Sequence, residues 1–306
     1  MDKSQQTRSY LMKKFEAIGI RPRAKLGQNF LIDLNLLRLL YESGQVDEND
    51  VVLEVGTGTG SLTAELSDRA AAVITVELDS VMHELAKQEL YGRNNITFLQ
   101  ADILRNKNRL NEEVLDAVHQ KLEEAPGRRF KLVANLPYSI ATPLMSNLLL
   151  TKYPPHSMTV TIQKELADRI TASPGTKDWG ALSLWMQAQC RTELIRVMAP
   201  SVFWPRPKVH SAIIRVVFEK HRQNKIPDLK FFHEFVRALF FHRRKFLRSE
   251  LCSAFKKTIP KSKIDEIMIE MGFGDTTRAE TLDLKTMLKL CECCRSELPE
   301  GERKIL

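Results

Sequence analysis

The sequence lacks any apolar run approaching the roughly 20 residues that a membrane-spanning helix needs. Its first stretch, MDKSQQTRSYLMKKFEAIGI, has no long apolar core and no small-residue cleavage site, so we expect no secretion signal. Cysteine is scarce, and the number of cysteines, five, is odd. A reducing compartment suits such a chain better than a disulfide framework does. We therefore expect a cytoplasmic protein that does not associate with a membrane.

Three of the cysteines lie close together, at Cys291, Cys293 and Cys294. No fourth ligand follows at a spacing typical of zinc sites, and three thiols on one short helical stretch would point in different directions. We expect these thiols to pack against other side chains, and we predict no metal site.

The composition is that of an ordinary globular protein, with 43% apolar and 27% charged residues in a chain of 306. This length favours two domains. The formal net charge is +8. Residues 219–262 contain twelve Lys or Arg against four Asp or Glu, and residues 1–30 contain seven against two. Positive charge gathered in two blocks indicates a surface that binds a polyanion.

Strand and helix patterns alternate over much of the chain. Apolar, β-branched runs predict strands at 51–55, 73–78, 96–100, 130–134 and 158–162. Helices are predicted near 34–41, 61–69, 80–90, 109–124, 142–150 and 164–171, and a short one over 10–20. This alternation is typical of an α/β fold with a parallel, doubly wound sheet covered on both faces. Residues 192–198 and 209–218 are further strand candidates, which we expect to pair antiparallel at the sheet edge.

The pattern changes at Pro227, after which the periodicity is helical, at 229–255, 262–271 and 283–294. The polar stretch HRQNKIPD is a natural boundary. We therefore expect an α/β domain over residues 1–220 and a small helical domain over residues 228–306.

The segment VVLEVGTGTG at 51–60 organises the first domain, because three glycines follow a buried strand directly. Gly56, Gly58 and Gly60 allow a ligand to lie against the backbone at the start of the next helix. The next strand ends in Glu77, about 20 residues past the first glycine, where a doubly wound sheet places the acid that binds a ribose. The glycine spacing differs from the G-x-G-x-x-G of dinucleotide enzymes. We therefore predict S-adenosylmethionine, rather than NAD, as the cofactor.

Asp102 follows the third predicted strand, and so opens onto the same edge of the sheet. Its carboxylate can accept a hydrogen bond from the amino group of an adenine, while Ile103 and Leu104 supply apolar walls. The alternative role for Asp102 is to cap a helix.

The most specific feature is Asn135-Leu136-Pro137-Tyr138, which follows the fourth predicted strand. Pro137 fixes its own φ and restricts Leu136 to extended geometry, so that the backbone carbonyl of Leu136 or that of Pro137 can point outward and accept a hydrogen bond. With the amide oxygen of Asn135 and the ring of Tyr138, these groups suit a planar base that carries an amino group. Phe203 or Trp204, in a proline-rich loop, can stack on the other face of that base. A proline turn over a buried tyrosine, and core packing of Phe203 and Trp204, are the alternatives.

Taken together, these motifs resemble those of the ribosomal RNA adenine N6-dimethyltransferases, in particular the group that acts on small-subunit RNA. The resemblance runs nearly from end to end. It is carried by KLGQNFL at 25–31, LEVGTGTGSLT at 53–63, VELD at 76–79, ADIL at 101–104, NLPYSIATPL at 135–144, QKELADRI at 163–170, PRPKVHSAIIRV at 205–216, FFHRRKFLRSEL at 240–251 and RAETLDLKTML at 278–288. It implies a Rossmann-like, S-adenosylmethionine-dependent methyltransferase sheet followed by a helical RNA-binding domain. The implied reaction, during ribosome biogenesis, dimethylates N6 of two adjacent adenosines in a loop near the 3′ end of that RNA.

The resemblance also implies roles for individual residues. Cofactor contacts fall on the glycine turn and on side chains around it: Asn29, Leu31, Gly56, Gly58, Glu77, Asp102 and Asn135. Target-base contacts fall on Asn135, Leu136, Pro137, Tyr138 and Phe203. This chain departs from the usual family pattern at His210, where members usually have Asp, and near Trp204 and Arg206.

Basic residues near both ends are the predicted contacts to small-subunit ribosomal RNA: Arg23, Lys25, Arg243, Arg244, Lys245 and Arg248. A solvated helix face is the alternative for the second cluster. We expect the protein to act as a monomer.

Two other functions remain open from the sequence. One is a large-subunit adenine methyltransferase of the macrolide-resistance type, which shares the cofactor and the NLPY-type motif. The other is a non-catalytic RNA-binding assembly factor on the same fold. The QNFL entry segment, the PKVHSA loop and the helical tail through RAETL favour the small-subunit group, and the intact Glu77, Asp102 and NLPY argue against loss of catalysis.

Overall fold

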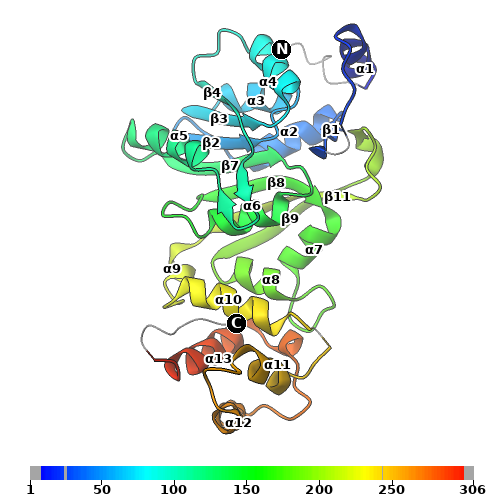
Figure 1. The fold of residues 1–306 in the computed structure, drawn as a ribbon. Coiled ribbons are helices and arrows are strands. Elements are labelled where there is room, and N and C mark those ends of the chain that lie inside the picture. Colours follow the sequence, from blue (N-terminus) through cyan, green and yellow to red (C-terminus); the bar gives the residue numbers. More distant parts are fainter. Residues whose placement is uncertain (1–7, 24–25, 243, 300–306) are drawn as a thin grey trace. The chain divides into compact units, whose positions relative to one another are not determined.

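The computed structural model describes residues 8–23, 26–242 and 244–299. Two compact units divide the chain: Met1–Ala167 with Glu193–Phe218, and Asp168–Thr192 with Glu219–Leu306. The first unit contains the α/β fold, and the second is helical (Figure 1). Residues 168–192 thus group with the C-terminal helices, although the sequence places a boundary near 220.

A seven-stranded sheet forms the centre of the first unit, with the strand order β4-β3-β2-β7-β8-β11-β9. These strands are β4 (Ile96–Gln100), β3 (Ala72–Glu77), β2 (Asp50–Val55), β7 (Arg129–Asn135), β8 (Ser157–Gln163), β11 (Ser211–Phe218) and β9 (Cys190–Met198). Neighbours from β4 to β8 are parallel, and β11 is antiparallel to β8. The predicted Rossmann-like sheet is confirmed, and β9 and β11 are neighbours at its edge.

Three helices of the first unit, α2 (Leu34–Ser43), α4 (Ser80–Glu89) and α5 (Glu112–Glu123), each begin at a residue whose side chain caps the helix. The Asp33 carboxylate accepts hydrogen bonds from the backbone N–H groups of Asn35 and Leu36, which starts α2. Asp79 and Asn111 do the same for α4 and α5. In chain order these elements are α2 (Leu34–Ser43), α3 (Ser61–Ser67), α4 (Ser80–Glu89), α5 (Glu112–Glu123), α6 (Ala141–Leu148) and α7 (Lys164–Thr171).

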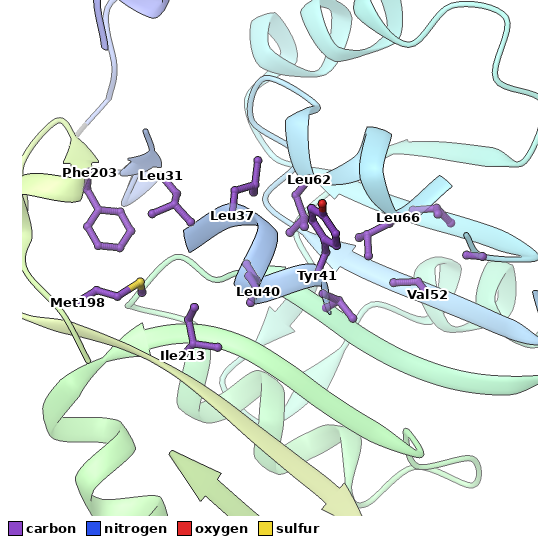
Figure 2. Packing of buried hydrophobic residues seen from close by; sticks show 13 residues of the cluster. Leu31, Leu37, Leu40, Tyr41, Val52, Leu62, Leu66, Met198, Phe203 and Ile213 are labelled. Atoms are coloured by element: carbon purple, nitrogen blue, oxygen red, sulfur yellow. The ribbon is translucent and has the colours of Figure 1, made fainter. Parts of the chain in front are cut away.

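Apolar side chains of α2 and α3 pack on one face of the sheet. Leu37 and Leu40 from α2 meet Val133 of β7 and Ile213 of β11 in one buried cluster. Figure 2 shows this cluster extending to Phe203 and its neighbours at one end. This packing holds α2 and α3 against the strands that carry the predicted site.

Several short elements carried no signal in the sequence. They are the two-residue strands β1 (Phe30–Leu31) and β10 (Phe203–Trp204), which pair with each other, and the hairpin of β5 (Leu104–Asn106) and β6 (Arg109–Leu110). The predicted helix start at 109 is therefore wrong, because residues 109–110 pair with β5 and Asn111 caps α5. Helix α1 (Arg8–Ala17) packs on the β1–β10 ribbon, with Phe15 in edge contact with Phe30 at a centroid distance of 5.3 Å.

The second unit consists of helices around an aromatic core. Its elements are α8 (Ala181–Gln187), α9 (Lys220–Gln223), α10 (Leu229–Leu239), α11 (Leu247–Ala254), α12 (Lys261–Glu270), the 3-10 turn Ala279–Thr281 and α13 (Leu284–Ser296). Phe231 and Phe235 of α10 pack on Phe255. The helical periodicity over 229–255 is interrupted between α10 and α11, where residues 240–242 and 244–246 are not helical. None of the helices in the described part of the chain has the length and apolarity to span a membrane.

Candidate active site

The glycine turn follows β2, as predicted, and it leads into α3. Gly56 and Gly58 have φ angles of +89° and +56°, which only glycine adopts without strain. A Cβ on Gly56 would lie 3.4 Å from Cδ of Pro137, and one on Gly58 would lie 3.1 Å from the Phe30 ring. The turn therefore passes directly beside the Asn-Leu-Pro-Tyr segment, and residues predicted from separate motifs come together.

The Glu77 carboxylate lies at the end of β3 and binds the glycine turn. One oxygen accepts from the Gly58 N–H at 3.0 Å, and the other accepts from the Asp79 N–H at 2.9 Å. Burial raises the pKa of Glu77 above its usual value, although these two backbone hydrogen bonds oppose the rise. Glu77 is thus fixed in orientation at the position where a ribose-binding acid is expected.

A second acid, Glu54, lies at the end of β2 and is buried completely, with 1% of its surface exposed. One carboxyl oxygen accepts hydrogen bonds from the hydroxyls of Thr63 (2.5 Å) and Thr75 (2.8 Å), and the Thr75 hydroxyl also contacts that of Thr57 at 2.6 Å. Burial raises the pKa of Glu54 to about 8. The network therefore ties the first threonine of the glycine turn to two neighbouring elements through a carboxyl that is protonated at neutral pH.

Asn135 ends β7, and its side chain is held by the segment that precedes β1. Its Nδ2 donates to the backbone carbonyl of Asn29 at 2.9 Å. Since a carbonyl can only accept, this contact fixes which way the amide points and leaves Oδ1 to face the opposite direction. The structure thus joins two residues that are far apart in the sequence and that the resemblance assigns to one site.

The backbone carbonyls of Leu136 and Pro137 are the two candidates to accept a hydrogen bond from the target amine. The Leu136 N–H donates to Thr161 in β8, and the Pro137 carbonyl accepts from the Ile140 N–H at 3.2 Å, where the chain enters α6. Leu136 itself is buried, with 2% exposed. Because the turn into α6 already uses the Pro137 carbonyl, the Leu136 carbonyl is the better candidate to accept from a ligand.

Tyr138 is half-buried, and its hydroxyl lies 2.5 Å from the hydroxyl of Ser211 at the start of β11. Burial raises the pKa of Tyr138 above its usual value. Phe203 is 2% exposed, and Figure 2 shows its ring beside Leu31 and Met198 in the apolar cluster. Trp204 is half-buried against Phe15, with ring centroids 5.4 Å apart.

Asp102 is exposed after β4, while the neighbouring Ile103 is 2% exposed. One oxygen of Asp102 accepts from the Leu104 N–H at 2.9 Å, which forms a local turn and not a helix cap. The cap of the next helix is Asn111, whose side chain also donates to the Asp102 carbonyl at 3.0 Å.

Two polar residues at this edge had no role assigned from the sequence. Gln28 donates to Asp79 at 3.1 Å and accepts from the Arg23 N–H at 2.7 Å. The Arg23 guanidinium also lies 3.5 Å from Asp79. Gln28 and Asp79 thus fasten the loop before β1 to the start of α4. Gln28 lies in the segment KLGQNFL and Asp79 lies in VELD. Their place in these two segments is the only signal in the sequence that could have identified them.

The predicted RNA contacts divide between the two units. Lys25 and Arg243 lie outside the described residues. Arg23 is engaged with Asp79, as above. Arg244 and Lys245 are exposed in the turn between α10 and α11. Arg248 pairs with Asp265 through two hydrogen bonds, of 2.5 Å and 2.9 Å.

The residues at this edge fit S-adenosylmethionine. The glycine turn presents backbone without side chains, Glu77 and Asp102 provide carboxylates beyond two adjacent strands, and the loop of Asn29 lies against Asn135.

Among the described residues, no group of three or more His, Cys, Asp or Glu is placed to hold a metal ion. Burial raises the pKa of the Cys291 and Cys294 thiols.

The comparison with family models adds an independent observation. Residues 19–290 match the model of the family described as ribosomal RNA adenine dimethylase. The chain belongs to this family. A match over this range takes in the glycine turn and most of the helical unit, so it is not confined to the sheet that carries the candidate site.

Relatives within the ribosomal RNA adenine dimethylase family are similar over most of their length. The ribosomal RNA small subunit methyltransferase A of Alkaliphilus oremlandii (strain OhILAs) is 38% identical over 261 residues, 85% of this chain and 87% of that protein. The protein of the same name from Bacillus cereus (strain B4264) is 35% identical over 277 residues, 90% of this chain and 92% of that protein.

Two solved structures share the fold. A dimethyladenosine transferase from Plasmodium falciparum matches with a TM-score of 0.68 and 23% identity, over 84% of this chain and 94% of that one. The 23S rRNA methyltransferase ErmE matches with a TM-score of 0.59 and 23% identity, over 85% and 97%. At this identity the likeness shows the fold alone.

Proposed function

We propose that this chain uses S-adenosylmethionine to dimethylate N6 of two adjacent adenosines in a loop near the 3′ end of small-subunit ribosomal RNA, during ribosome biogenesis. The observation that carries the proposal is the fixed amide of Asn135 beside the glycine turn, in a chain of the ribosomal RNA adenine dimethylase family. An amide held in one orientation supplies a defined acceptor for an amino group.

The protein's main task is to prepare the adenine amine as a nucleophile. The N6 lone pair is delocalised into the ring, so N6 attacks poorly in free adenine. Hydrogen bonds from N6 to Oδ1 of Asn135 and to the Leu136 carbonyl favour a pyramidal nitrogen whose lone pair points away from these acceptors. The same acceptors stabilise the positive charge that develops on N6 during transfer.

Tyr138 supports the base from one face, because its ring is held by the contact between its hydroxyl and Ser211. A second aromatic contact, from Phe203 as the resemblance implies, requires the buried Phe203 ring to become accessible. Trp204, which is half-buried in the same ribbon, is the more accessible of the two rings. We therefore assign the stacking contact with the target base to Tyr138.

When bound, S-adenosylmethionine supplies an electrophilic methyl group on a sulfonium. Asn135 and Leu136 hold N6 where it would take up this methyl group, and the sulfur would leave as a thioether that keeps the electron pair of the broken carbon–sulfur bond. N6 then loses a proton to water, so no side chain has to act as a base before transfer. Glu77, Asp102 and the loop of Asn29 and Leu31 hold the cofactor, and the chain gains rate mainly through positioning.

The large-subunit methyltransferases of the macrolide-resistance type are the second candidate. The fold alone does not separate the two, because ErmE shares it. The small-subunit function is favoured by the relatives named ribosomal RNA small subunit methyltransferase A, which are 35–38% identical over most of the chain. A non-catalytic assembly factor would not need Glu77, Asn135 and the glycine turn in this arrangement.

Small-subunit ribosomal RNA is the proposed partner, the helical unit is the proposed RNA-binding part, and the protein is proposed to act as a cytoplasmic monomer. The excess of positive charge over residues 219–262 supports the role of the helical unit.

The test is to incubate the purified chain with methyl-labelled S-adenosylmethionine and unmethylated small subunits, and then to map the label. We expect label on N6 of two adjacent adenosines near the 3′ end of the RNA, with two methyl groups on each. Large subunits serve as the matched control. Label on large-subunit RNA alone would favour the second candidate, and no label on either would refute methyl transfer to ribosomal adenines.

A further inference from the structure

The turn between α10 and α11 contains an exposed aromatic side chain for which the proposed chemistry has no use. Phe241 is 78% exposed, and it lies in the basic segment FFHRRKF at 240–246. A single exposed apolar residue is common on protein surfaces. What distinguishes Phe241 is how the structure holds it and what lies beside it.

A chain of contacts connects the Phe241 ring to a buried carboxylate. The ring meets His242 in a T-shaped contact, with centroids 4.7 Å apart and planes at 80°. Nδ1 of His242 lies 3.5 Å from an oxygen of Glu250, whose side chain is 3% exposed on α11. Nζ of Lys245 lies 4.0 Å from the same oxygen. The buried Glu250 carboxylate thus lies within 4.0 Å of both His242 and Lys245 in this turn, while the Phe241 ring faces solvent.

The surrounding groups single out Phe241 and Arg244 in this segment. The ring of Phe246 is 43% exposed and carries the Arg278 guanidinium at 5.6 Å from its centroid. Arg248 is bound by Asp265 through both of its hydrogen bonds. Arg244, by contrast, is exposed within the turn, three residues after Phe241 in the sequence. An exposed ring and an exposed cation in one turn offer a surface for the base of a nucleotide and a charge for its phosphate.

We propose that Phe241 is a stacking platform for an unpaired nucleobase of RNA, and that Arg244 binds a phosphate next to that base. The inference rests on the proposed function only for the source of the RNA. Unpaired bases stack on aromatic rings whatever their sequence, because every base has a π-face. The local excess of twelve basic over four acidic residues at 219–262 favours a polyanion over an acidic or neutral protein surface.

The test separates stacking from charge by using two RNA probes with the full chain. One is a fluorescein-labelled single strand of about 12 nucleotides, within the range that such sites bind, and the other has the same backbone with abasic sites. We expect Phe241→Ala to weaken binding of the first probe about tenfold and to leave both the abasic probe and the salt dependence unchanged. Arg244→Ala should weaken both probes and reduce the slope of log affinity against log salt by about one.

Ile269→Ala is the matched control, because Ile269 is also 78% exposed in the same unit but lies on α12 among acidic residues. Wild-type affinity in Phe241→Ala, or an equal loss on the abasic probe, would overturn the platform. A loss on whole small subunits with none on the base-containing strand would mean that Phe241 meets a protein, which also overturns it. Thermal unfolding of Phe241→Ala should match that of the wild type, since the ring is exposed. Methylation of subunits is read separately, so an inactive wild-type chain that still shows base-dependent binding would refute the proposed function and not the platform.

Discussion

Glu54 should make the stability of this protein depend on pH in an unusual direction. Its pKa in the folded chain is about 8, against an ordinary 4.5. Below about pH 4.5 both folded and unfolded states bind the proton, and Glu54 has no effect. As the pH rises toward 8 the unfolded state releases the proton while the folded state keeps it, so the free energy of unfolding falls. Above pH 8 the buried group is ionised and the full cost is present.

The magnitude follows from the difference in pKa. Each pKa unit corresponds to about 1.4 kcal/mol, so Glu54 lowers the free energy of unfolding by about 3 kcal/mol at pH 7 and by at most about 5 kcal/mol above pH 8. Glu54→Gln keeps an acceptor for the hydroxyls of Thr63 and Thr75 and has no proton to lose.

Urea unfolding at pH 5, 7 and 9 is the assay. The variant should gain stability over the wild type as the pH rises, and Glu48→Gln, at an exposed position, should follow the wild type. Parallel pH profiles for Glu54→Gln and wild type would show that the carboxyl is not neutral, and would refute the reasoning.

Three further changes test other parts of the structure. Asp50→Ala removes a fully buried carboxylate 2.7 Å from Nζ of Lys131, and should cost about 3–5 kcal/mol in urea unfolding at pH 7; a loss below about 1 kcal/mol would mean that water reaches the pair. Ser211→Ala removes the partner of the Tyr138 hydroxyl and should lower kcat/KM for subunits about fivefold, with no change in cofactor Kd measured by calorimetry; a change in that Kd alone would contradict the assignment. Gly58→Ala places a Cβ at φ +56° and 3.1 Å from a phenyl ring, so it should cost about 1–2 kcal/mol and weaken cofactor binding; unchanged Tm and Kd would show that the turn adjusts freely.

The sheet and its order of strands and helices follow from the sequence because each element is long enough to show a period. The runs that predict β2, β3 and β7 are buried on both faces, as a covered parallel sheet requires. The β1–β10 ribbon shows no such signal, since two residues carry no period and their pairing is set by tertiary contacts. The break between α10 and α11 is hidden for a related reason: apolar residues continue at helical spacing through the exposed turn.

The candidate site is predictable where one motif contains the whole feature, and not where a partner is distant in the chain. The glycine turn and Glu77 can be placed by their spacing after two strands. The contact of Tyr138 with Ser211 joins residues 73 positions apart. The neutral state of Glu54 depends on burial that only the fold creates. From the sequence, either the Leu136 or the Pro137 carbonyl could accept from the target amine. In the structure the Ile140 N–H donates to the Pro137 carbonyl, which favours the Leu136 carbonyl as the acceptor.

The central claim is that the fixed amide of Asn135 prepares the adenine amine for transfer. Asn135→Ala removes this acceptor and leaves the glycine turn, Glu77 and Asp102 in place. We predict that methyl transfer to unmethylated small subunits falls at least about a hundredfold, while the Kd for S-adenosylmethionine rises no more than about fivefold. Transfer at the wild-type rate by a folded Asn135→Ala chain would contradict the account.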